Sequence, residues 1–519
     1  MLNYWWVTRP KRKLNHVPEI LTLFSDTALN QQWSGNRTSH LGVEASLESQ
    51  GLKRQGDRRD GTGGGGRTYL AWLKSLGLLF SQSDTRLLRL TLAGEAIIAG
   101  ASPVAVLKNQ VFKYQFPSCF SLGRNVNVAP RFKIRPFRFL IKLLLDSRLG
   151  YYFTEPELAK IVVTEAENES DKCYEYIISR ILQYREVGDR CLPSDFAVRY
   201  QPSKGGPKFD APFSHLLDIA NTMVNWLEYT QLVCRVDGKV MLLSEKVDEA
   251  VSLLSYEPPF IDRPHDEEFF QRKFGVDPWH RKDSRNLKET ANVTSLMLDT
   301  RRIQNAYIVE SLKEPITGIS SELIDKVAVS TGLGTSLVQD VLFRLYPHGS
   351  LSGFLSNYYS MAFKGTAEAT DFEKATVKLF ENVFGFTAEH VGPIGLTPDV
   401  LLLSDAEGYQ AIIDNKAYSK YSISNDHHNR MVHNYIGGLS NYSAYDKPLA
   451  FYSYIAGGFG NQIGNQLLKI KAETGVDGSA VPVSSMIKLA ENFSTLHLGH
   501  SGIRKLFSVN RKVELNDFM

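Results

Sequence analysis

The first part of the chain has helical spacing of apolar residues, then two short apolar runs, then helical spacing again. Tyr69–Leu79 carries apolar side chains three and four residues apart, and Phe80–Leu90 contains two apolar runs around a polar turn. Thr91 then stands at the N-cap position of another helix. The order of helix, hairpin and helix predicts a winged-helix-like domain, an arrangement suited to reading DNA.

A second segment repeats this order. His215–Thr230 has the spacing of an amphipathic helix, and Leu232–Leu243 consists of two apolar runs around Asp237-Gly238, a strong signal for a hairpin turn. We expect a second winged-helix-like domain here. Between the two segments, Arg131–Leu145 and Cys173–Tyr184 are expected to form core helices with basic faces.

A third helical pattern covers Leu323–Leu342. Ala328, Gly332 and Val338 occupy the offsets that a helix-turn-helix uses for a small contact residue, a tight turn and an apolar residue facing the core. Two interpretations stay open, a DNA reader and a spacer that only packs. The Ser-, Gly- and Tyr-rich stretch Leu351–Gly365 then predicts a linker.

A domain boundary is expected before this helical pattern. Pro258–Pro264 and Asp277–Lys288 are rich in proline and charged residues, which favour irregular connections over packed elements.

The last part of the chain changes to an alternation of helix and strand. Asp371–Phe384 has helical spacing, Asp399–Leu403 begins an apolar strand, and Tyr409–Lys416 is a second strand that ends in charged residues. A short polar turn joins the two strands, so they are expected to pair antiparallel.

Charged residues stand at the ends of these two strands. Pro398-Asp399 comes fifteen residues before Asp414-Asn415-Lys416, the PD…DxK spacing of metal-dependent nucleases. Asp399 and Asp414 on adjacent strands, with the backbone carbonyl of Asn415, offer the oxygen ligands that Mg²⁺ prefers. Lys416 follows Asp414 by two residues, on the same strand face, where it can position or activate the attacking water.

Glu373 is one turn into the helix that precedes these strands. Its carboxylate is a possible further metal ligand. The alternative is an ordinary first-turn glutamate that the helix dipole favours.

Charge is distributed unevenly along the chain. The net charge is only +3, yet residues 1–150 hold 22 Lys and Arg against 9 Asp and Glu, whereas residues 151–519 hold 37 against 47. A basic end favours a polyanionic partner such as duplex DNA, and a merely solvated basic surface is the alternative. The candidate DNA contacts flank Gly63–Gly66, expected to be a mobile loop, or lie in a second basic loop: Arg54, Arg58, Arg59, Arg67, Lys204 and Lys208.

Several classes of protein are disfavoured. No apolar run approaches the ~20 residues of a membrane span, and the N-terminus lacks the features of a signal peptide, so an intracellular, cytoplasmic protein is expected. The four cysteines have neither zinc-site nor disulfide spacing. The glycine run lacks the pattern of a nucleotide-binding loop.

Residues 371–512 resemble the cleavage domain of the FokI-type restriction endonucleases. The similarity lies in VFGFTAEHVG, the Pro-Asp pair, IIDNKAYS and YIAGGFGNQIGNQLLKI. It implies that Asp399, Asp414 and Lys416 are catalytic and that Glu373 matches the helix glutamate of the family. Asn415 stands where the family has threonine.

The same resemblance implies a transient homodimer through the cleavage domain. In the family, an Asp and an Arg four residues apart pair across the dimer, and Asp426 and Arg430 match them. An intrahelical ion pair worth about 0.3–0.5 kcal/mol is the alternative for these two residues.

The N-terminal half is similar to the AlwI-like group of restriction and nicking endonucleases. The similar stretches are NYWWVTRP, LGLL…LTLAGE, FKYQFPS and KIRPFRFLIKLLL. This implies recognition of a short asymmetric duplex sequence, cleavage a few base pairs to one side, and a cognate DNA methyltransferase that acts on the same sequence without a stable complex.

Together these patterns predict a multidomain protein, mainly α-helical winged-helix-like domains followed by an α/β PD-(D/E)xK nuclease domain with a central mixed sheet. The expected domains are residues 1–150 and 151–260 for recognition, 261–365 as a helical spacer, and 366–519 for cleavage. The predicted function is that of a Mg²⁺-dependent type IIS restriction endonuclease. A nicking endonuclease of the same fold and a catalytically silent DNA-binding regulator remain alternatives.

Overall fold

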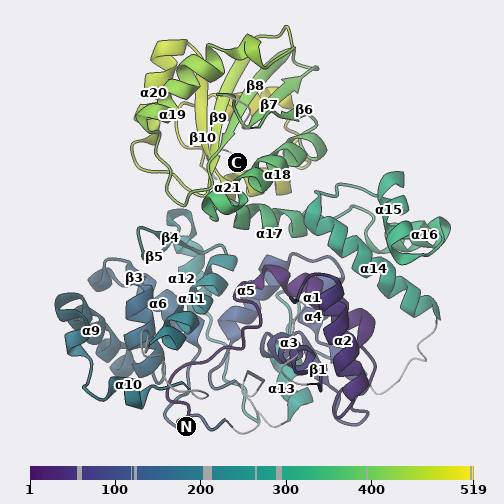
Figure 1. Cartoon of the computed structure of the whole chain (residues 1–519), viewed down its shortest axis with the longest axis vertical. Coiled ribbons are helices and arrows are strands. Elements are labelled where there is room, and N and C mark those ends of the chain that lie inside the picture. Colours follow the sequence, from purple (N-terminus) through teal and green to yellow (C-terminus); the bar gives the residue numbers. More distant parts are fainter. Residues whose placement is uncertain are drawn as a thin grey trace. The chain divides into compact units, whose positions relative to one another are not determined.

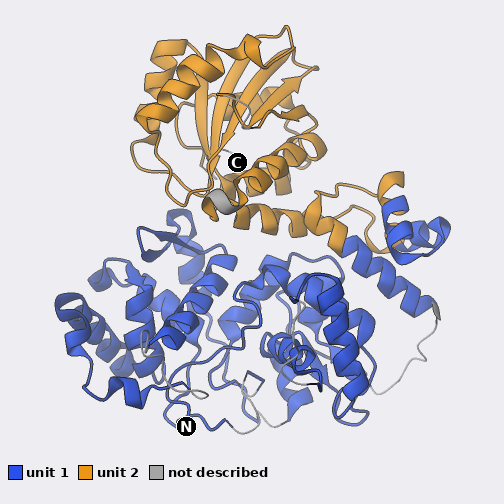
Figure 2. Ribbon diagram, in the orientation of Figure 1, with its two compact units in different colours: residues 1–308, 325–341 blue, residues 309–324, 342–519 orange. Residues whose placement is uncertain are grey.

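The computed structural model describes residues 1–54, 61–118, 120–121, 126–202, 213–263, 266–287, 295–392, 396–514 and 517. The chain forms two compact units (Figure 2). Unit 1 comprises Met1–Ile308 and Asp325–Val341, and unit 2 comprises Val309–Ile324 and Leu342–Met519. The boundaries of the four predicted domains stay predictions, and each unit is described by itself.

Unit 1 begins with helices around a short hairpin (Figure 1). The predicted order of helix, hairpin and helix is present: Leu79 pairs with Leu90 across the hairpin, and the Thr91 side chain accepts the backbone N–H of Gly94 as an N-cap. These elements are a 3₁₀ turn Leu14–His16, α1 Val17–Thr27, α2 Arg37–Ser49, α3 Gly64–Ser75, β1 Leu79–Ser81, β2 Leu88–Leu90, α4 Leu92–Ile98 and α5 Pro103–Lys113.

The glycine run Gly63–Gly66 is not the mobile loop that the sequence suggested. Gly63 is the N-cap of α3 with φ +80°, and the following glycines form the first turn of that helix. A Cβ at Gly63 would lie 2.5 Å from the His40 Cβ, and one at Gly66 would lie 2.8 Å from the His40 carbonyl oxygen. The glycines are required because α3 approaches α2 closely here.

The elements from α6 to α12, within residues 136–255, include a three-stranded antiparallel sheet in the order β3-β5-β4. The hairpin predicted at Asp237-Gly238 is confirmed, with φ of +51° and +75° at the two turn residues. The elements are α6 Pro136–Leu144, a 3₁₀ turn Ser147–Leu149, β3 Tyr152–Thr154, α7 Glu155–Glu157, a π-helical turn Leu158–Val162, α8 Val163–Glu165, α9 Asp171–Val187, a 3₁₀ turn Gly188–Cys191, α10 Phe196–Arg199, α11 Ser214–Tyr229, β4 Val233–Val236, β5 Lys239–Leu242, a 3₁₀ turn Ser244–Lys246 and α12 Val247–Ser255.

The segment expected to be a boundary packs onto the first helices instead. Between its two stretches lies α13, Glu267–Phe274, whose Glu268 side chain accepts the backbone N–H of Ser83 at 2.7 Å in the β1–β2 hairpin. Phe274 lies against Gly77, where an added Cβ would be 2.6 Å from its ring. Proline and charge in this region therefore serve local capping and ion pairs rather than a flexible connection.

Three helices follow α13. They are α14 Ser295–Lys313, α15 Ser321–Thr331 and α16 Thr335–Leu345. The predicted helix-turn-helix shape is confirmed, with Gly332 at φ +69° in the turn between α15 and α16. Contact of these helices with DNA stays a prediction.

Unit 2 contains a five-stranded mixed sheet in the order β10-β9-β8-β7-β6. Strands β6, β7 and β8 pair antiparallel, whereas β8, β9 and β10 pair parallel. The elements are α17 Ser352–Met361, a 3₁₀ turn Gly365–Glu368, α18 Ala369–Asn382, β6 Thr387–His390, β7 Val400–Ser404, β8 Tyr409–Asn415, α19 Asn425–Asn429, a π-helical turn Arg430–Ile436, a 3₁₀ turn Leu439–Asn441, β9 Leu449–Ala456, α20 Ile463–Thr474, β10 Asp477–Pro482, α21 Val483–Asn492 and α22 His500–Phe507.

The predicted linker Leu351–Gly365 is mostly helix α17, which packs into the core of unit 2. Tyr358 is fully buried, its ring lies 5.0 Å from that of Phe372 in α18, and its hydroxyl hydrogen-bonds with Thr376 at 2.9 Å. Small polar residues suggested a flexible segment. The aromatic residues among them, spaced for one helix face, supply the buried contacts.

No helix in the described ranges is both long enough and apolar enough to cross a lipid bilayer.

Candidate active site

Strands β7 and β8 bring the two aspartates of the motif together. Val400 pairs antiparallel with Ile413, so Asp399, which precedes Val400, and Asp414, which follows Ile413, lie side by side at the same end of the sheet. The Asp399 Oδ2 accepts the backbone N–H of Asn415 at 2.6 Å. Asp414 is buried, and it pairs with Tyr454 on β9.

Lys416 follows β8 and returns to the same carboxylates. Its Nζ lies 2.7 Å from the Asp414 Oδ2. Burial alone would lower the pKa of Lys416, but the carboxylates of Asp414 and Asp399 outweigh burial and raise that pKa above its ordinary value. Lys416 is therefore a fixed positive charge beside the aspartate pair.

The carboxyl of Asp399 has a strongly raised pKa. Burial is the largest cause, and the negative charge of Asp414 adds to it, so that the pKa reaches about 9. The charges of Lys416 and the N–H of Asn415 act in the opposite direction, and Glu373 acts with burial. Without a further cation, ionisation of Asp399 beside the carboxylate of Asp414 is therefore unfavourable.

Asn415 anchors the motif to the opposite face of the sheet. Successive strand residues point to opposite faces, so Asn415 faces α18 while Asp414 does not. Its side-chain amide donates a hydrogen bond to the Thr376 hydroxyl at 2.7 Å, and Thr376 also contacts Tyr358. Sequence reasoning identified Asn415 only through its backbone carbonyl and missed Thr376, because their contact spans 39 residues.

Glu373 lies near Asp399 but already has a partner. The Glu373 Oε2 is 2.8 Å from the His390 Nε2, on strand β6. Its negative charge contributes to the raised pKa of Asp399, which places it in the same electrostatic environment. His390 was not singled out from the sequence, since nothing in its local pattern indicates this contact.

The donor set fits a hard divalent cation. The Asp414 Oδ1 is buried and has no hydrogen-bond partner among the described residues. The carboxylate of Asp399 lies beside it on the neighbouring strand. Orphaned carboxylate oxygens of this kind are costly unless a cation or water satisfies them. Among the described residues, no group of three or more His, Cys, Asp or Glu side chains is arranged to hold a metal ion. A cation here would therefore rely on the two aspartates with backbone, water or substrate oxygens.

Tyrosines form the wall beside Asp414. Tyr421 and Tyr435 are buried, and the charge of Asp414 adds to burial in raising the pKa of both, to about 12 for Tyr435. The Tyr421 hydroxyl is 2.8 Å from the His427 Nδ1. These residues were missed from the sequence, although Tyr421 follows Lys416 by only five positions.

The two residues assigned to dimerisation pair within one chain. The Arg430 Nη2 is 2.8 Å from the Asp426 Oδ2, and the two side chains are 42% and 65% exposed. Both are accessible on the surface of unit 2. Their role in a dimer stays a prediction.

The candidate DNA contacts of the sequence divide into two groups. Arg54 is exposed, and Arg67 donates to the Thr62 carbonyl at 2.6 Å near the start of α3. The others lie outside the described residues: Arg58, Arg59, Lys204 and Lys208.

The mixed sheet with two aspartates and a lysine at the ends of adjacent strands has the arrangement of a PD-(D/E)xK nuclease domain. Residues 333–514 match the family described as the cleavage domain of FokI. This C-terminal region is therefore similar to the cleavage domain of FokI, over about a third of the chain.

Among curated proteins, the chain is similar to the type II restriction enzyme StsI of Streptococcus sanguinis. The two are 26% identical over 149 residues, which are 27% of this chain and 24% of StsI. The match therefore spans about a quarter of the length of that relative.

Among solved structures, two endonucleases align with the chain. The structure of restriction endonuclease FokI covers 99% of this chain and 100% of its own, at 14% identity and a TM-score of 0.29. The BpuJ1 endonuclease binding domain, in complex with modified DNA, covers 53% of this chain and 96% of its own, at 14% identity and a TM-score of 0.36.

Proposed function

We propose that this protein is a type IIS restriction endonuclease. It binds a short asymmetric duplex sequence with its N-terminal half and hydrolyses phosphodiester bonds at a fixed distance with the site in unit 2. The observation that carries this proposal is the cluster of Asp399, Asp414 and Lys416 on adjacent strands, within a region of the FokI cleavage-domain family.

Mg²⁺ is the proposed cofactor. Asp399 and Asp414 would hold it with the backbone carbonyl of Asn415, and the unpartnered Asp414 Oδ1 supports this assignment. Glu373 would join through a water on its other carboxylate oxygen, since its Oε2 contacts His390. When bound, the cation would polarise the phosphate and lower the pKa of a nearby water.

Lys416 is the proposed side chain that acts on the attacking water and on the phosphate. Its ammonium, held 2.7 Å from Asp414, lies where it can orient the attacking water and offset the negative charge that develops on the phosphate. The water oxygen would form a bond to phosphorus as the bond from phosphorus to the 3′ oxygen breaks. The water would lose a proton to solvent, and the displaced 3′ oxygen would take one up. Asn415, fixed to Thr376, keeps the end of β8 in place during this step.

Recognition is assigned to unit 1. The basic surplus of residues 1–150 and the two sets of helix and hairpin support DNA-reading domains of winged-helix type. A cognate methyltransferase acting on the same sequence would protect the host DNA.

Double-strand cleavage is proposed to need a second copy of the cleavage domain, since one site serves one strand. Asp426 and Arg430 are the proposed contacts of this transient homodimer. Because they form an ion pair within one chain, a nicking endonuclease of the same fold is the second candidate.

Replacement of Asp414 tests the assignment of the site. Asp414→Asn keeps the side-chain shape but removes the charge, so cleavage of plasmid DNA with Mg²⁺ should be lost by several orders of magnitude. Binding of the same DNA in Ca²⁺ should stay within a few fold of the wild type. Loss of both binding and cleavage, with a lowered melting temperature, would mean that Asp414 is structural.

A further inference from the structure

The residues after α13 form a loop, and hydrogen bonds from α5 fix the beginning of this loop. We name residues 277–282, with the sequence Asp-Pro-Trp-His-Arg-Lys, the Trp279 loop. Immediately before it, Asn109 and Lys113 of α5 donate hydrogen bonds to the Val276 carbonyl at 3.0 and 2.6 Å. Lys113 and Gln110 also donate to the Phe274 carbonyl, at 2.8 and 3.0 Å.

Asp277 fixes the conformation of the loop itself. Its buried carboxylate accepts the backbone N–H groups of Trp279 and His280 at 2.8 and 2.9 Å. It also lies 2.8 Å from the His280 Nδ1. Such aspartate turns order a loop without help from secondary structure.

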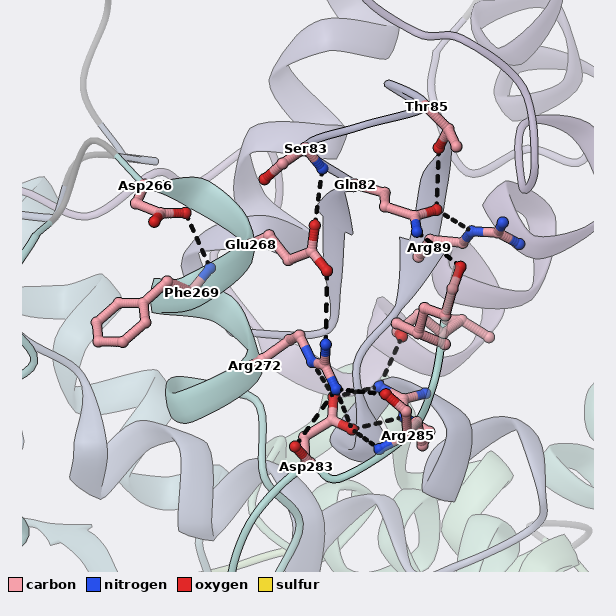
Figure 3. Close-up of polar contacts among 12 residues, drawn as sticks. Gln82, Ser83, Thr85, Arg89, Asp266, Glu268, Phe269, Arg272, Asp283 and Arg285 are labelled. Atoms are coloured by element: carbon pink, nitrogen blue, oxygen red, sulfur yellow. Dashed lines mark hydrogen bonds and ion pairs between the residues drawn. The ribbon is translucent and has the colours of Figure 1, made fainter. Parts of the chain in front are cut away.

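Asp283 anchors the other end of the loop, as Figure 3 shows. Its buried carboxylate binds the Arg285 Nη2 at 2.7 Å and the Arg272 Nε at 3.2 Å. Downstream, the Gln82 side chain donates to the Leu287 carbonyl at 2.7 Å. The loop is thus held at both ends by contacts with α5, α13 and the β1–β2 hairpin.

The fixed loop presents cations and an aromatic ring to solvent. Trp279 is 60% exposed, and His280, Arg281 and Lys282 are exposed beside it. Within the described ranges, Arg281, Lys282 and the neighbouring Lys273 form no ion pair with a carboxylate. The nearby acidic residues are bound in local contacts, so the positive charges are available to a partner.

Apart from Trp279, these residues line one wall of an open cavity of about 1150 Å³ within unit 1. Lys273, Arg281 and Lys282 are among its lining residues. Its acidic lining residues have the structural roles of helix cap, hairpin contact and loop anchor: Asp266, Glu268, Asp277 and Asp283. The exposed rim of the cavity therefore carries Lys273, Arg281 and Lys282, which form no ion pair with a carboxylate of the described residues.

We propose that the Trp279 loop, together with Lys273, binds the phosphodiester backbone of duplex DNA, with Trp279 packed against the sugars. The inference rests on the proposed function and names a surface for it. Phosphate contacts from pre-positioned Lys and Arg fix the register of a protein on DNA, and exposed aromatic rings beside them match the apolar sugar edge. An acidic protein partner is disfavoured because the basic excess of the chain lies in the same unit.

Salt dependence of binding gives the direct test. The affinity of wild-type protein and of the double variant Arg281→Ala/Lys282→Ala for a labelled duplex of random sequence is measured in EDTA over a salt series. Each lost phosphate contact lowers the slope of log affinity against log salt by about 0.9, so the double variant should lose about 1.8. Trp279→Ala should weaken binding with little change in slope.

Two further variants serve as controls. Lys172→Ala/Arg190→Ala removes two exposed cations of unit 1 outside the cavity and should leave the slope unchanged. Arg281→Lys/Lys282→Arg keeps both charges and should bind with the wild-type slope. A wild-type slope in the double alanine variant overturns the loop assignment. Absence of salt-dependent binding by the wild-type protein would instead overturn the proposed function.

Discussion

Asp399 lies where ionisation of its carboxyl, buried beside Asp414, lowers the stability of the folded protein. Two carboxylates side by side, one of them with a pKa raised to about 9 by burial and by the other, form an arrangement that packing alone would not favour. Residues of this kind are typical of functional sites, where a ligand compensates the cost. This electrostatic cost is therefore expected to lower the free energy of unfolding of the protein without metal.

The pH dependence of stability tests this cost. In the unfolded chain Asp399 ionises near pH 3.8, whereas in the folded protein it keeps its proton up to about pH 9. Folding thus takes up a proton between these values, and the free energy of unfolding should fall as pH rises through this window. Asp399→Asn cannot ionise, so its melting temperature in EDTA should exceed that of the wild type by an amount that grows with pH.

Asp405→Asn provides the matched control, because Asp405 is exposed in the turn between β7 and β8. It should follow the wild-type pH profile. A constant difference between Asp399→Asn and wild type at all pH values would contradict the raised pKa.

Residues of the site could be predicted where their chemistry is local in sequence. Asp414 and Lys416 are two positions apart, and the strand period places them on one face. His390 and Thr376 were not predicted, because each acts through a contact between distant elements, with Glu373 and with Asn415. Contacts of this kind depend on how the sheet and α18 pack.

At the level of elements, periodic patterns were reliable and compositional signals were not. Both hairpins and the strands β7 and β8 were expected from alternation and turn residues, and they are present. The glycine run that begins α3 was predicted to be a loop, the polar segment that forms α17 a linker, and the charged segment around α13 a boundary. Each is ordered by tertiary contacts that composition does not encode.

Helix α17 should be essential to the folding of unit 2. A fragment that begins at Ser352 retains the contacts of Tyr358 with Phe372 and Thr376, whereas one that begins at Thr366 loses them. Loss of a buried aromatic side chain alone typically costs about 3–5 kcal/mol. We expect the longer fragment to unfold cooperatively on heating and the shorter one to unfold at a much lower temperature or not to fold. Equal melting temperatures would show that α17 is dispensable.

At the scale of the whole molecule, the proposed homodimer predicts that the two strands of DNA are cut at different rates in variants of Asp426 and Arg430. If Asp426 and Arg430 contact a second copy, Asp426→Ala or Arg430→Ala should slow the conversion of nicked to linear plasmid more than the first nick. The melting temperature should hardly change, because exposed ion pairs of this spacing contribute only about 0.3–0.5 kcal/mol.

The ion pair Arg199–Asp195 is a matched control in unit 1. It has the same spacing, a distance of 3.1 Å and similar exposure. Arg199→Ala should leave both cleavage steps at the wild-type ratio. Equal slowing of the two steps in the Asp426 and Arg430 variants would contradict the dimer contact and favour the nicking enzyme.

The most direct measurement for the account as a whole is cleavage of DNA by the purified protein. Supercoiled plasmid and unmethylated phage DNA are incubated with Mg²⁺, and the cut ends are mapped by sequencing. We expect discrete linear fragments whose ends lie at a fixed offset from one shared asymmetric sequence. Open circles alone would restrict the protein to nicking, and DNA left intact with Mg²⁺ and with Mn²⁺ would contradict the assignment of a nuclease.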